Sequence, residues 1–285
     1  MREYREIYVI KADGEKELFL QSKLERSLKK TGTSKKLIKE IVDHVNAEIE
    51  DGMTTSEIYK HAFSLLRKSE EKTVAARYSI RRGVFALGPS GFPFENYVAE
   101  IFTALGYNTR IQQVIQGKCA THEVDLVAEK DNHRISAEIK FHNRLGIKTD
   151  LKVVLYVHAR FLDIHEQENL GEGDMVREAW LITNTKFTKS SISYAKCVDL
   201  KLLSWFYPNK RGLYDLITQT RVYPITCLST LSDREKKNLL DQKIVLCRDL
   251  GEDTDALQRA GVAPAKIATV IAESQALCTG DHRIE

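Results

Sequence analysis

The sequence is poor in cysteine, proline and glycine. Its 285 residues include five Cys, five Pro and 15 Gly. Sparse glycine and proline exclude collagen-like and linker-dominated architectures. The cysteines are odd in number, widely spread and never spaced as CxxC, which argues against a disulfide framework and against a structural zinc site.

Long apolar runs are missing too. One of the longest is VVLYV at 153–157, far short of the ~18 residues that a membrane helix needs. The first ten residues alternate charged and apolar side chains and lack the apolar core of a signal peptide. We therefore expect a cytoplasmic protein that does not act at a membrane.

The composition is that of a folded protein with ordinary cores. Apolar residues make up 42% and charged residues 29% of the chain. At about 150 residues per domain, the length suggests two or three domains. The net charge is only +3, so a nucleic acid would have to be held by local patches rather than by the overall charge.

The first segment, 1–88, is typical of a β-hairpin followed by about four helices. IYVI at 7–10 and ELFL at 17–20 flank the turn signal Asp13-Gly14. Ser22-x-x-Glu25 and Thr54-x-x-Glu57 have the capping-box pattern and predict two helix starts.

The second segment, 89–222, predicts a mixed α/β domain, and GPSGFP at 88–93 is the expected boundary before it. The pattern predicts the order αβββαβαβ, with helices over 93–105, 150–165 and 188–197 and strands over 108–115, 122–128, 134–141, 179–183 and 200–206. Trp180, Trp205 and Phe206 are expected in its core. The remaining segment, 223–285, predicts a small helical module in which Ser232-x-x-Glu235 opens one helix, and Gly261 and Pro264 separate two others.

The stretch HEVDLVAEKDNHRISAEIKFHN, 122–143, carries the most chemical information. It predicts two paired strands, and because side chains alternate along a strand, Glu138 and Lys140 share one face. Val124, Leu126 and Ala128 are expected on a common face, with Asp125 opposite. Pairing of the two strands would then bring Asp125 beside Glu138 and Lys140.

Two neighbouring carboxylates repel each other when ionised, and a hard divalent cation such as Mg²⁺ or Mn²⁺ relieves that repulsion. The carbonyl oxygen of Ile139 could add a further ligand, and Lys140 could stabilise charge on a phosphate. Glu95 leans from the 93–105 helix toward the sheet. His142 is expected to be exposed. An E-x-K pair on a strand is, taken alone, more often part of a solvated face.

The combination of a helix carboxylate, VDLV and AEIK in this element order resembles the PD-(D/E)xK nucleases. LITNTKFTKSSISYAKCVDLKLL, later in the chain, resembles the last strand–helix–strand of Mrr-like restriction endonucleases. The resemblance covers about 90–207, with Val124 where the family name has proline. It implies Asp125 and Glu138 as metal ligands, Lys140 as the catalytic lysine and Glu95 as an auxiliary acid.

The first segment resembles the ATP-cone, the regulatory nucleotide-binding domain of ribonucleotide reductases. The similarity runs through VIKADGEKELFLQSKLERSL, GMTTSEIY and ARYSIRR, with Ala12 where the family usually has a second basic residue. It implies that ATP or dATP binds as a regulatory ligand. The residues carried over are Val9, Lys11, Gly14, Glu17, Lys23 and Thr55.

Together these patterns predict an ATP-cone-like domain, a restriction-endonuclease-like domain and a small helical module over 1–88, 89–222 and 223–285. The expected function is metal-dependent cleavage of DNA, regulated by an adenine nucleotide, with a homodimer supplying two sites. Two alternatives stay open: a nucleotide-responsive regulator that binds DNA without cutting it, and a nuclease for branched DNA or RNA.

Overall fold

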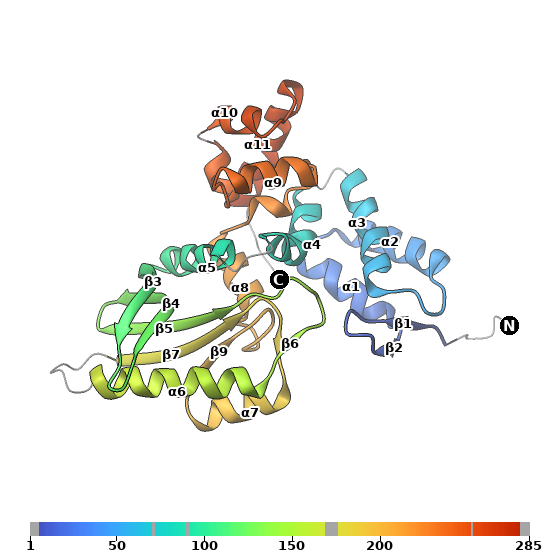
Figure 1. Cartoon of the computed structure of the whole chain (residues 1–285). Coiled ribbons are helices and arrows are strands. Elements are labelled where there is room, and N and C mark those ends of the chain that lie inside the picture. Colours follow the sequence, from blue (N-terminus) through green and yellow to red (C-terminus); the bar gives the residue numbers. More distant parts are fainter. Residues whose placement is uncertain (1–5, 70–71, 89–91, 169–175, 252, 280–285) are drawn as a thin grey trace. The chain divides into compact units, whose positions relative to one another are not determined.

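The computed structural model describes residues 6–69, 72–88, 92–168, 176–251 and 253–279. The chain divides into two compact units, Met1–Gly83 with Tyr223–Glu285 (unit 1) and Val84–Val222 (unit 2) (Figure 1). The C-terminal segment therefore folds with the N-terminal one. Of the expected boundary at 88–93, residues 89–91 lie outside the described residues.

Unit 1 opens with the predicted hairpin and four helices. These are β1 (Tyr8–Ile10), β2 (Lys16–Leu18), α1 (Gln21–Lys30), α2 (Lys35–Glu48), α3 (Thr55–Lys68) and α4 (Lys72–Phe85). Gly14 has φ 82° in the hairpin turn, a conformation that glycine adopts at little cost. The predicted capping box of α3 is present in both directions, because Thr54 and Glu57 each accept the other's backbone N–H.

The other predicted capping box in this segment, Ser22 to Glu25, is wrong. Helix α1 starts at Gln21, and its N-cap residue, Leu20, makes no side-chain capping bond. The hairpin closes through a bond from the Phe19 N–H to the Ile7 carbonyl, and the chain enters the helix directly afterwards. Glu25 instead accepts a bond from Gln21, one turn earlier.

One apolar core holds the hairpin and these helices together. It is formed by the buried residues Val9, Leu24, Leu28, Ile41, Val42, Val45, Ile58, Ala62, Leu66, Val74 and Ala75. Most recur at helical spacing, so α1, α2 and α3 each turn an apolar stripe inward. The hairpin is anchored in the same core by Val9.

The C-terminal part of unit 1 is helical, as predicted. It contains two short 3₁₀ helices, η1 (Ile225–Cys227) and η2 (Cys247–Gly251), and the helices α9 (Asp233–Asp241), α10 (Thr254–Arg259) and α11 (Pro264–Thr279). Ser232 and Glu235 form the predicted capping box of α9.

Helix α4 carries this C-terminal part. The Ser79 hydroxyl donates to the Cys227 carbonyl at 2.7 Å, and the Thr226 hydroxyl donates to the Gly83 carbonyl at 2.7 Å. A Cβ added at Gly83 would lie 2.9 Å from the Cys227 backbone nitrogen, so only glycine lets the two backbones approach this closely.

Unit 2 is a mixed α/β domain whose main elements follow the predicted order, with the short strands β6 and β8 and the helix α8 in addition. Its elements are α5 (Phe92–Ala104), β3 (Asn108–Gln116), β4 (Thr121–Lys130), β5 (His133–Lys140), β6 (Lys148–Thr149), α6 (Leu151–Glu168), β7 (Val176–Thr183), β8 (Lys186–Phe187), α7 (Lys189–Cys197), β9 (Lys201–Leu203) and α8 (Leu213–Thr220). The five-stranded sheet has the order β3-β4-β5-β7-β9. The short β6 and β8 pair apart from it.

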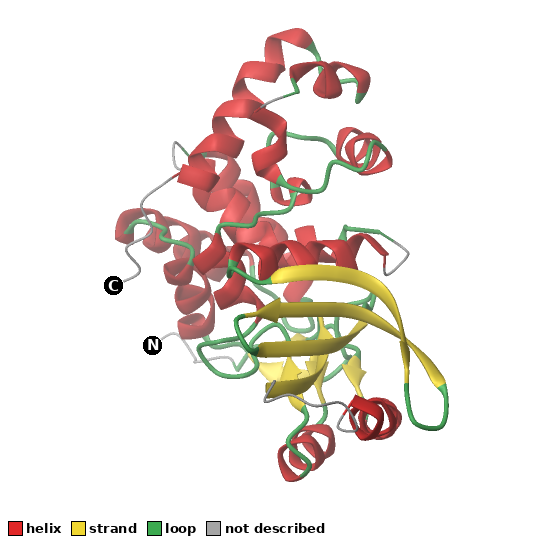
Figure 2. Ribbon diagram, turned by 90° about the vertical axis from the view of Figure 1, so that its left-hand side faces the viewer, coloured by secondary structure: helices red, strands yellow, loops and turns green. Residues whose placement is uncertain are grey.

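The sheet is antiparallel on one side and parallel on the other. β3, β4 and β5 pair antiparallel, whereas β5, β7 and β9 pair parallel through the crossover helices α6 and α7. Figures 1 and 2 show the twisted sheet between α5 on one face and α6 with α7 on the other. Both faces of the central strands are therefore covered, which explains why polar positions such as Ser136 are buried.

Of the three aromatic residues expected in the core, one is misplaced. Trp205 is buried and Trp180 is half-buried, with its ring against Phe102 of α5. Phe206 is 49% exposed. The last strand ends at Leu203, so Phe206 lies in the turn after it rather than in the sheet. None of the helices in the described part of the chain is long and apolar enough to cross a membrane.

We predict that Gly83→Ala lowers the stability of the protein. Overpacking at a backbone contact costs about 1–3 kcal/mol, whereas alanine in a helix is favoured over glycine by about 1 kcal/mol. The clash with the Cys227 backbone should outweigh the helical gain, and calorimetry should show a lower Tm. An unchanged or raised Tm would mean that the C-terminal part can move away from α4 at no cost.

Candidate active site

The candidate site lies where β4 and β5 stop pairing. The last paired residues of this ladder are Leu126 and Ala137, and Asp125 and Glu138 are the next along each strand. Asp125 Oδ2 accepts the backbone N–H of Ile139 at 2.6 Å, so this carboxylate reaches across to the neighbouring strand. The structure brings Asp125 next to the E-x-K stretch, as the strand pattern predicts.

The predicted alternation of β4 is wrong at Asp125. Val124 and Val127 both belong to the apolar cluster that includes Val157 and Phe161 of α6, although an uninterrupted strand would place them on opposite faces. Gln112, which would pair with Asp125, is absent from the register and has a left-handed φ of 50°. Non-glycine residues in this region are uncommon and recur at functional sites. Asp125 thus sits at a local change of strand facing.

Glu138 is the most buried carboxylate of the site, with a side chain only 4% exposed. Its Oε1 lies 2.5 Å from Lys140 Nζ and accepts a bond from the Tyr156 hydroxyl at 3.3 Å. Its Oε2 accepts a bond from Arg160 Nη1. Taking an ion from water into a protein costs several kcal/mol of solvation free energy, which attraction to ions of opposite charge can offset. Here two cations compensate one anion.

Tyr156 and Arg160 are the residues that the sequence patterns missed. They lie one turn apart on α6, and the Tyr156 ring is 5.7 Å from the Arg160 guanidinium and 5.8 Å from Lys140 Nζ. An (i, i+4) pair of a tyrosine and an arginine is common on helices. Only the position of α6 over β5 distinguishes this pair.

The pKa values of the other two carboxylates, Asp125 and Glu95, are both raised. Burial and the charge of Glu138 raise the pKa of Asp125, although the Ile139 N–H and the nearby Lys140 and Arg160 act in the opposite direction. Burial and the charge of Asp125 likewise raise the pKa of Glu95 on α5, which is half-buried. The charges of Asp125, Lys140 and Glu138 therefore act on Glu95 as well.

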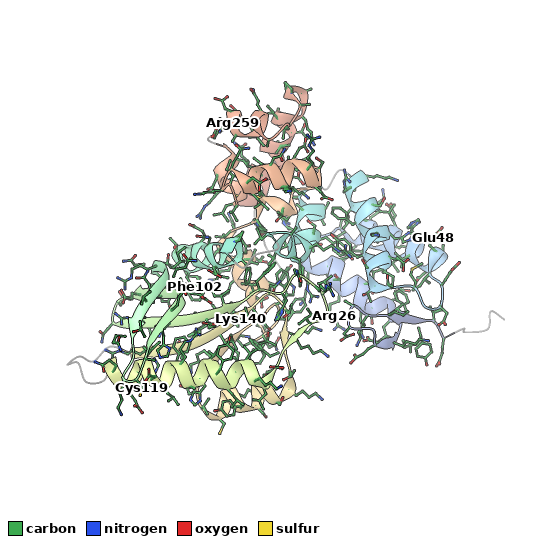
Figure 3. All side chains as sticks on the ribbon, viewed as in Figure 1. Arg26, Glu48, Phe102, Cys119, Lys140 and Arg259 are labelled. Atoms are coloured by element: carbon green, nitrogen blue, oxygen red, sulfur yellow. The ribbon has the colours of Figure 1, made fainter. Side chains whose placement is uncertain are left out.

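Lys140 keeps its charge at neutral pH. Burial disfavours the charged form, but the contacts with Glu138 and Tyr156 together outweigh burial and raise the pKa of Lys140. Lys140 is the last residue of β5, the central strand of the unit 2 sheet, and Figure 3 shows it apart from Cys119 in the β3–β4 turn. The site thus lies at the end of the central strand and not in the outer hairpin.

The expectation that His142 is exposed is wrong. It is half-buried, its imidazole lies 3.1 Å from the Thr149 hydroxyl, and burial together with the charge of Lys140 lowers its pKa. The side chain of the buried Asn184 accepts the His142 N–H and donates to the His142 carbonyl. Asn184, from the TN motif after β7, thereby fixes the strand end that carries Lys140.

The oxygen donors here fit a hard divalent cation. Asp125 and Glu138 supply carboxylates, and Ile139 supplies a backbone carbonyl, the kind of partial set with which Mg²⁺ binds while keeping several waters. Burial and, second to it, a neighbouring carboxylate raise the pKa of both Asp125 and Glu95, and a bound cation would favour the charged form of each. Among the described residues no three His, Cys, Asp or Glu are grouped so that they could hold a metal.

A second cluster of predicted residues lies on the unit 1 hairpin. Glu17 on β2 pairs with Lys11 at 2.7 Å and also with Lys23 of α1. Val9, in contrast, is buried in the apolar core and offers only its backbone to a ligand. The hairpin and the start of α1 therefore present two lysines that are held together by one carboxylate.

The N-terminus of α3 lies beside this hairpin. Ile10 forms a parallel bridge with Thr54, and the Ile10 N–H donates to the Met53 carbonyl at 3.0 Å. Thr55 is the first residue of α3 and comes directly after Thr54, the residue that bridges to Ile10 of β1. Gly14 lies in the hairpin turn. Backbone N–H groups at a helix N-terminus together with nearby lysines suit a phosphate.

Comparison with known proteins finds three family models that match successive parts of the chain. The family model of the ATP cone domain matches residues 7–84, and that of a restriction endonuclease domain, Mrr_cat, matches residues 88–204. A third, described as AF1548-like, C-terminal, matches residues 223–278. The chain thus carries an ATP-cone domain fused to an Mrr-like restriction endonuclease domain.

An uncharacterized protein of Archaeoglobus fulgidus is 36% identical over 183 residues, which are 62% of this chain and 98% of that protein. A crystal structure titled as the protein of unknown function AF1548 is 34% identical, with a TM-score of 0.52, over 66% of this chain and 98% of the other. The chain belongs to the AF1548-like family. In this AF1548-like protein the carboxylate–lysine cluster falls inside the restriction endonuclease match, and the lysine-bearing hairpin falls inside the ATP-cone match.

We predict that Asp125→Asn raises the Tm of the metal-free AF1548-like protein by a few degrees at neutral pH. Because the pKa of Asp125 is higher in the folded than in the unfolded chain, the folded chain keeps its proton over a pH interval where the unfolded chain has lost it. Stability therefore falls as the pH rises through that interval, and the ionised carboxylate is a cost above it. Asparagine removes the charge and can still accept the Ile139 N–H.

Calorimetry of the variant from pH 4 to 8 checks this expectation. The surface substitution Glu166→Gln, which breaks only the exposed pair with Lys118, should leave the pH dependence unchanged. A variant that is less stable than the wild type at pH 7 would show that Asp125 is held by favourable contacts instead of being strained by its neighbours.

Proposed function

We propose that the protein is a metal-dependent endodeoxyribonuclease whose activity is regulated by ATP or dATP. The observation that carries the proposal is the meeting of Asp125, Glu138 and Lys140 at the end of the β4–β5 ladder, inside the restriction endonuclease match. Asp125 and Glu138, with the Ile139 carbonyl, would hold Mg²⁺ or Mn²⁺. A bound cation of this kind polarises a phosphate and lowers the pKa of a coordinated water.

The protein's own side chains have separate tasks in this proposal. Lys140, charged and close to Glu138, offers its ammonium group to the phosphate or to the attacking water. Glu95, whose pKa is raised, can exchange a proton near the same place. Cutting both strands of DNA takes two sites, so a homodimer is part of the proposal.

Regulation would start at the ATP-cone hairpin and act on α4. Ser56, next to Thr55 at the start of α3, accepts a bond from Arg82 of α4 at 2.8 Å, and the Arg82 guanidinium lies 3.8 Å over the Tyr59 ring. α4 runs from unit 1 into unit 2, because the division between the units falls after Gly83. A nucleotide that orders the start of α3 would therefore act on a helix that leads directly to the nuclease domain.

We predict that Lys140→Ala and Glu138→Gln each lower Mg²⁺-dependent cleavage of plasmid DNA by at least about 100-fold. The assay uses methylated and unmethylated plasmid with Mg²⁺ or Mn²⁺, and the matched control is Lys152→Ala, an exposed lysine of α6. Far-ultraviolet circular dichroism checks that each variant is folded. Undiminished cleavage by Lys140→Ala would contradict the proposed role of Lys140 in cleavage.

One alternative function is a regulator that binds DNA without cutting it. The same assay separates the two, because retention of DNA on the protein with no cleavage under any metal or nucleotide condition would favour the regulator. A panel with branched DNA and RNA separates the remaining alternative, in which the chemistry is the same and the substrate differs.

We predict that Lys11→Ala and Lys23→Ala each weaken ATP and dATP binding about tenfold, because a charge-assisted hydrogen bond to phosphate contributes about 1.5 kcal/mol or more. Isothermal titration of the full chain measures the affinity. Lys16→Ala, on exposed β2 of the same hairpin, should bind as the wild type does. Equal affinity in all three variants would place the nucleotide elsewhere.

A further inference from the structure

Glu138 uses its two carboxylate oxygens differently. Oε1 is shared by the Lys140 ammonium and the Tyr156 hydroxyl, whereas Oε2 is bound by Arg160. Arg160 also donates to the Glu123 carbonyl at 3.1 Å, so its guanidinium is bound to both β4 and β5. Lys140 lies on the same strand as Glu138, while Arg160 comes from α6, on the sheet face opposite α5.

This difference matters once Lys140 acts on a substrate. If Lys140 turned from Glu138 toward a phosphate, a carboxylate that is 4% exposed would lose one of its two cations. An uncompensated buried charge is strongly destabilising. Arg160 keeps Oε2 paired throughout, which allows Oε1 to change partners.

We propose that Arg160 is a positioning residue that holds the Glu138 carboxylate in place through Oε2, and so sets the affinity of this site for a divalent cation. The inference rests on the proposed function, because it assumes that Asp125 and Glu138 are the metal ligands. Arg160 acts through Glu138 and does not touch the substrate. Tyr156 binds Oε1, the oxygen that changes partners, and therefore contributes less than Arg160 to the position of Glu138.

The test is Mn²⁺ binding to the full chain without DNA, measured from the electron paramagnetic resonance signal of free Mn²⁺. Groups that orient a metal ligand typically contribute 10–100-fold in affinity, so Arg160→Gln should weaken Mn²⁺ binding at least about tenfold. Arg160→Lys keeps a cation at Oε2 and should regain most of the affinity. Tyr156→Phe should weaken Mn²⁺ binding less than Arg160→Gln does. The control Lys152→Gln, on the same helix, should bind Mn²⁺ as the wild type does.

Several outcomes would overturn the proposal. Tighter Mn²⁺ binding by Arg160→Gln would mean that Arg160 competes with the metal, and unchanged binding would mean that Glu138 needs no second cation. Should Arg160→Gln fail to fold, the ranking of Arg160→Lys against Tyr156→Phe decides, since weaker binding by Tyr156→Phe would assign the positioning role to the Oε1 side.

Cleavage of plasmid DNA by the wild type separates this proposal from the proposed function. A wild type that binds Mn²⁺ and cuts DNA, beside an Arg160→Gln variant that binds equally well, would overturn the role of Arg160 alone. A wild type that neither binds Mn²⁺ nor cuts DNA would overturn both.

Discussion

The site depends on one buried carboxylate and the cations that compensate it. Glu138 lies in the middle of a sheet that is covered on both faces, where an isolated charge would be unstable. Lys140 from the same strand and Arg160 from the crossover helix offset that cost. Lys140, paired with a buried glutamate, therefore contributes to the stability of the fold.

The surrounding structure keeps this arrangement at the end of a strand pair. Gln112 takes a left-handed conformation opposite Asp125, and the facing of β4 changes there, which leaves Asp125 close to Glu138 and within reach of Glu95. Asn184 fixes the backbone just beyond Lys140. Local strain and like-charge repulsion are thus held in place by hydrogen bonds and packing around them, as is common where stability is given up for function.

In unit 1, several contacts converge on helix α4. The hairpin that carries Lys11 and Glu17 pairs with the residue before Thr55, and the helix that begins there is tied to α4 through Ser56 and Arg82. α4 also carries the C-terminal part through Ser79 and Gly83. The ATP-cone, the C-terminal part and the chain leading to the nuclease domain thus meet on one helix.

The sequence alone determined the element order, the capping boxes at Thr54 and Ser232, and the E-x-K strand, because these depend on alternation, helical spacing and local hydrogen bonds. The approach of Asp125 to the strand that carries Glu138 and Lys140 also followed from pairing two adjacent strands. Arg160 and Tyr156 did not, because α6 packs over β5 only through the parallel crossover to β7. The half-buried His142, the exposed Phe206 and the reversal at Asp125 likewise needed the tertiary structure. Each is set by which surface covers a residue, and residues far apart in the sequence form that surface.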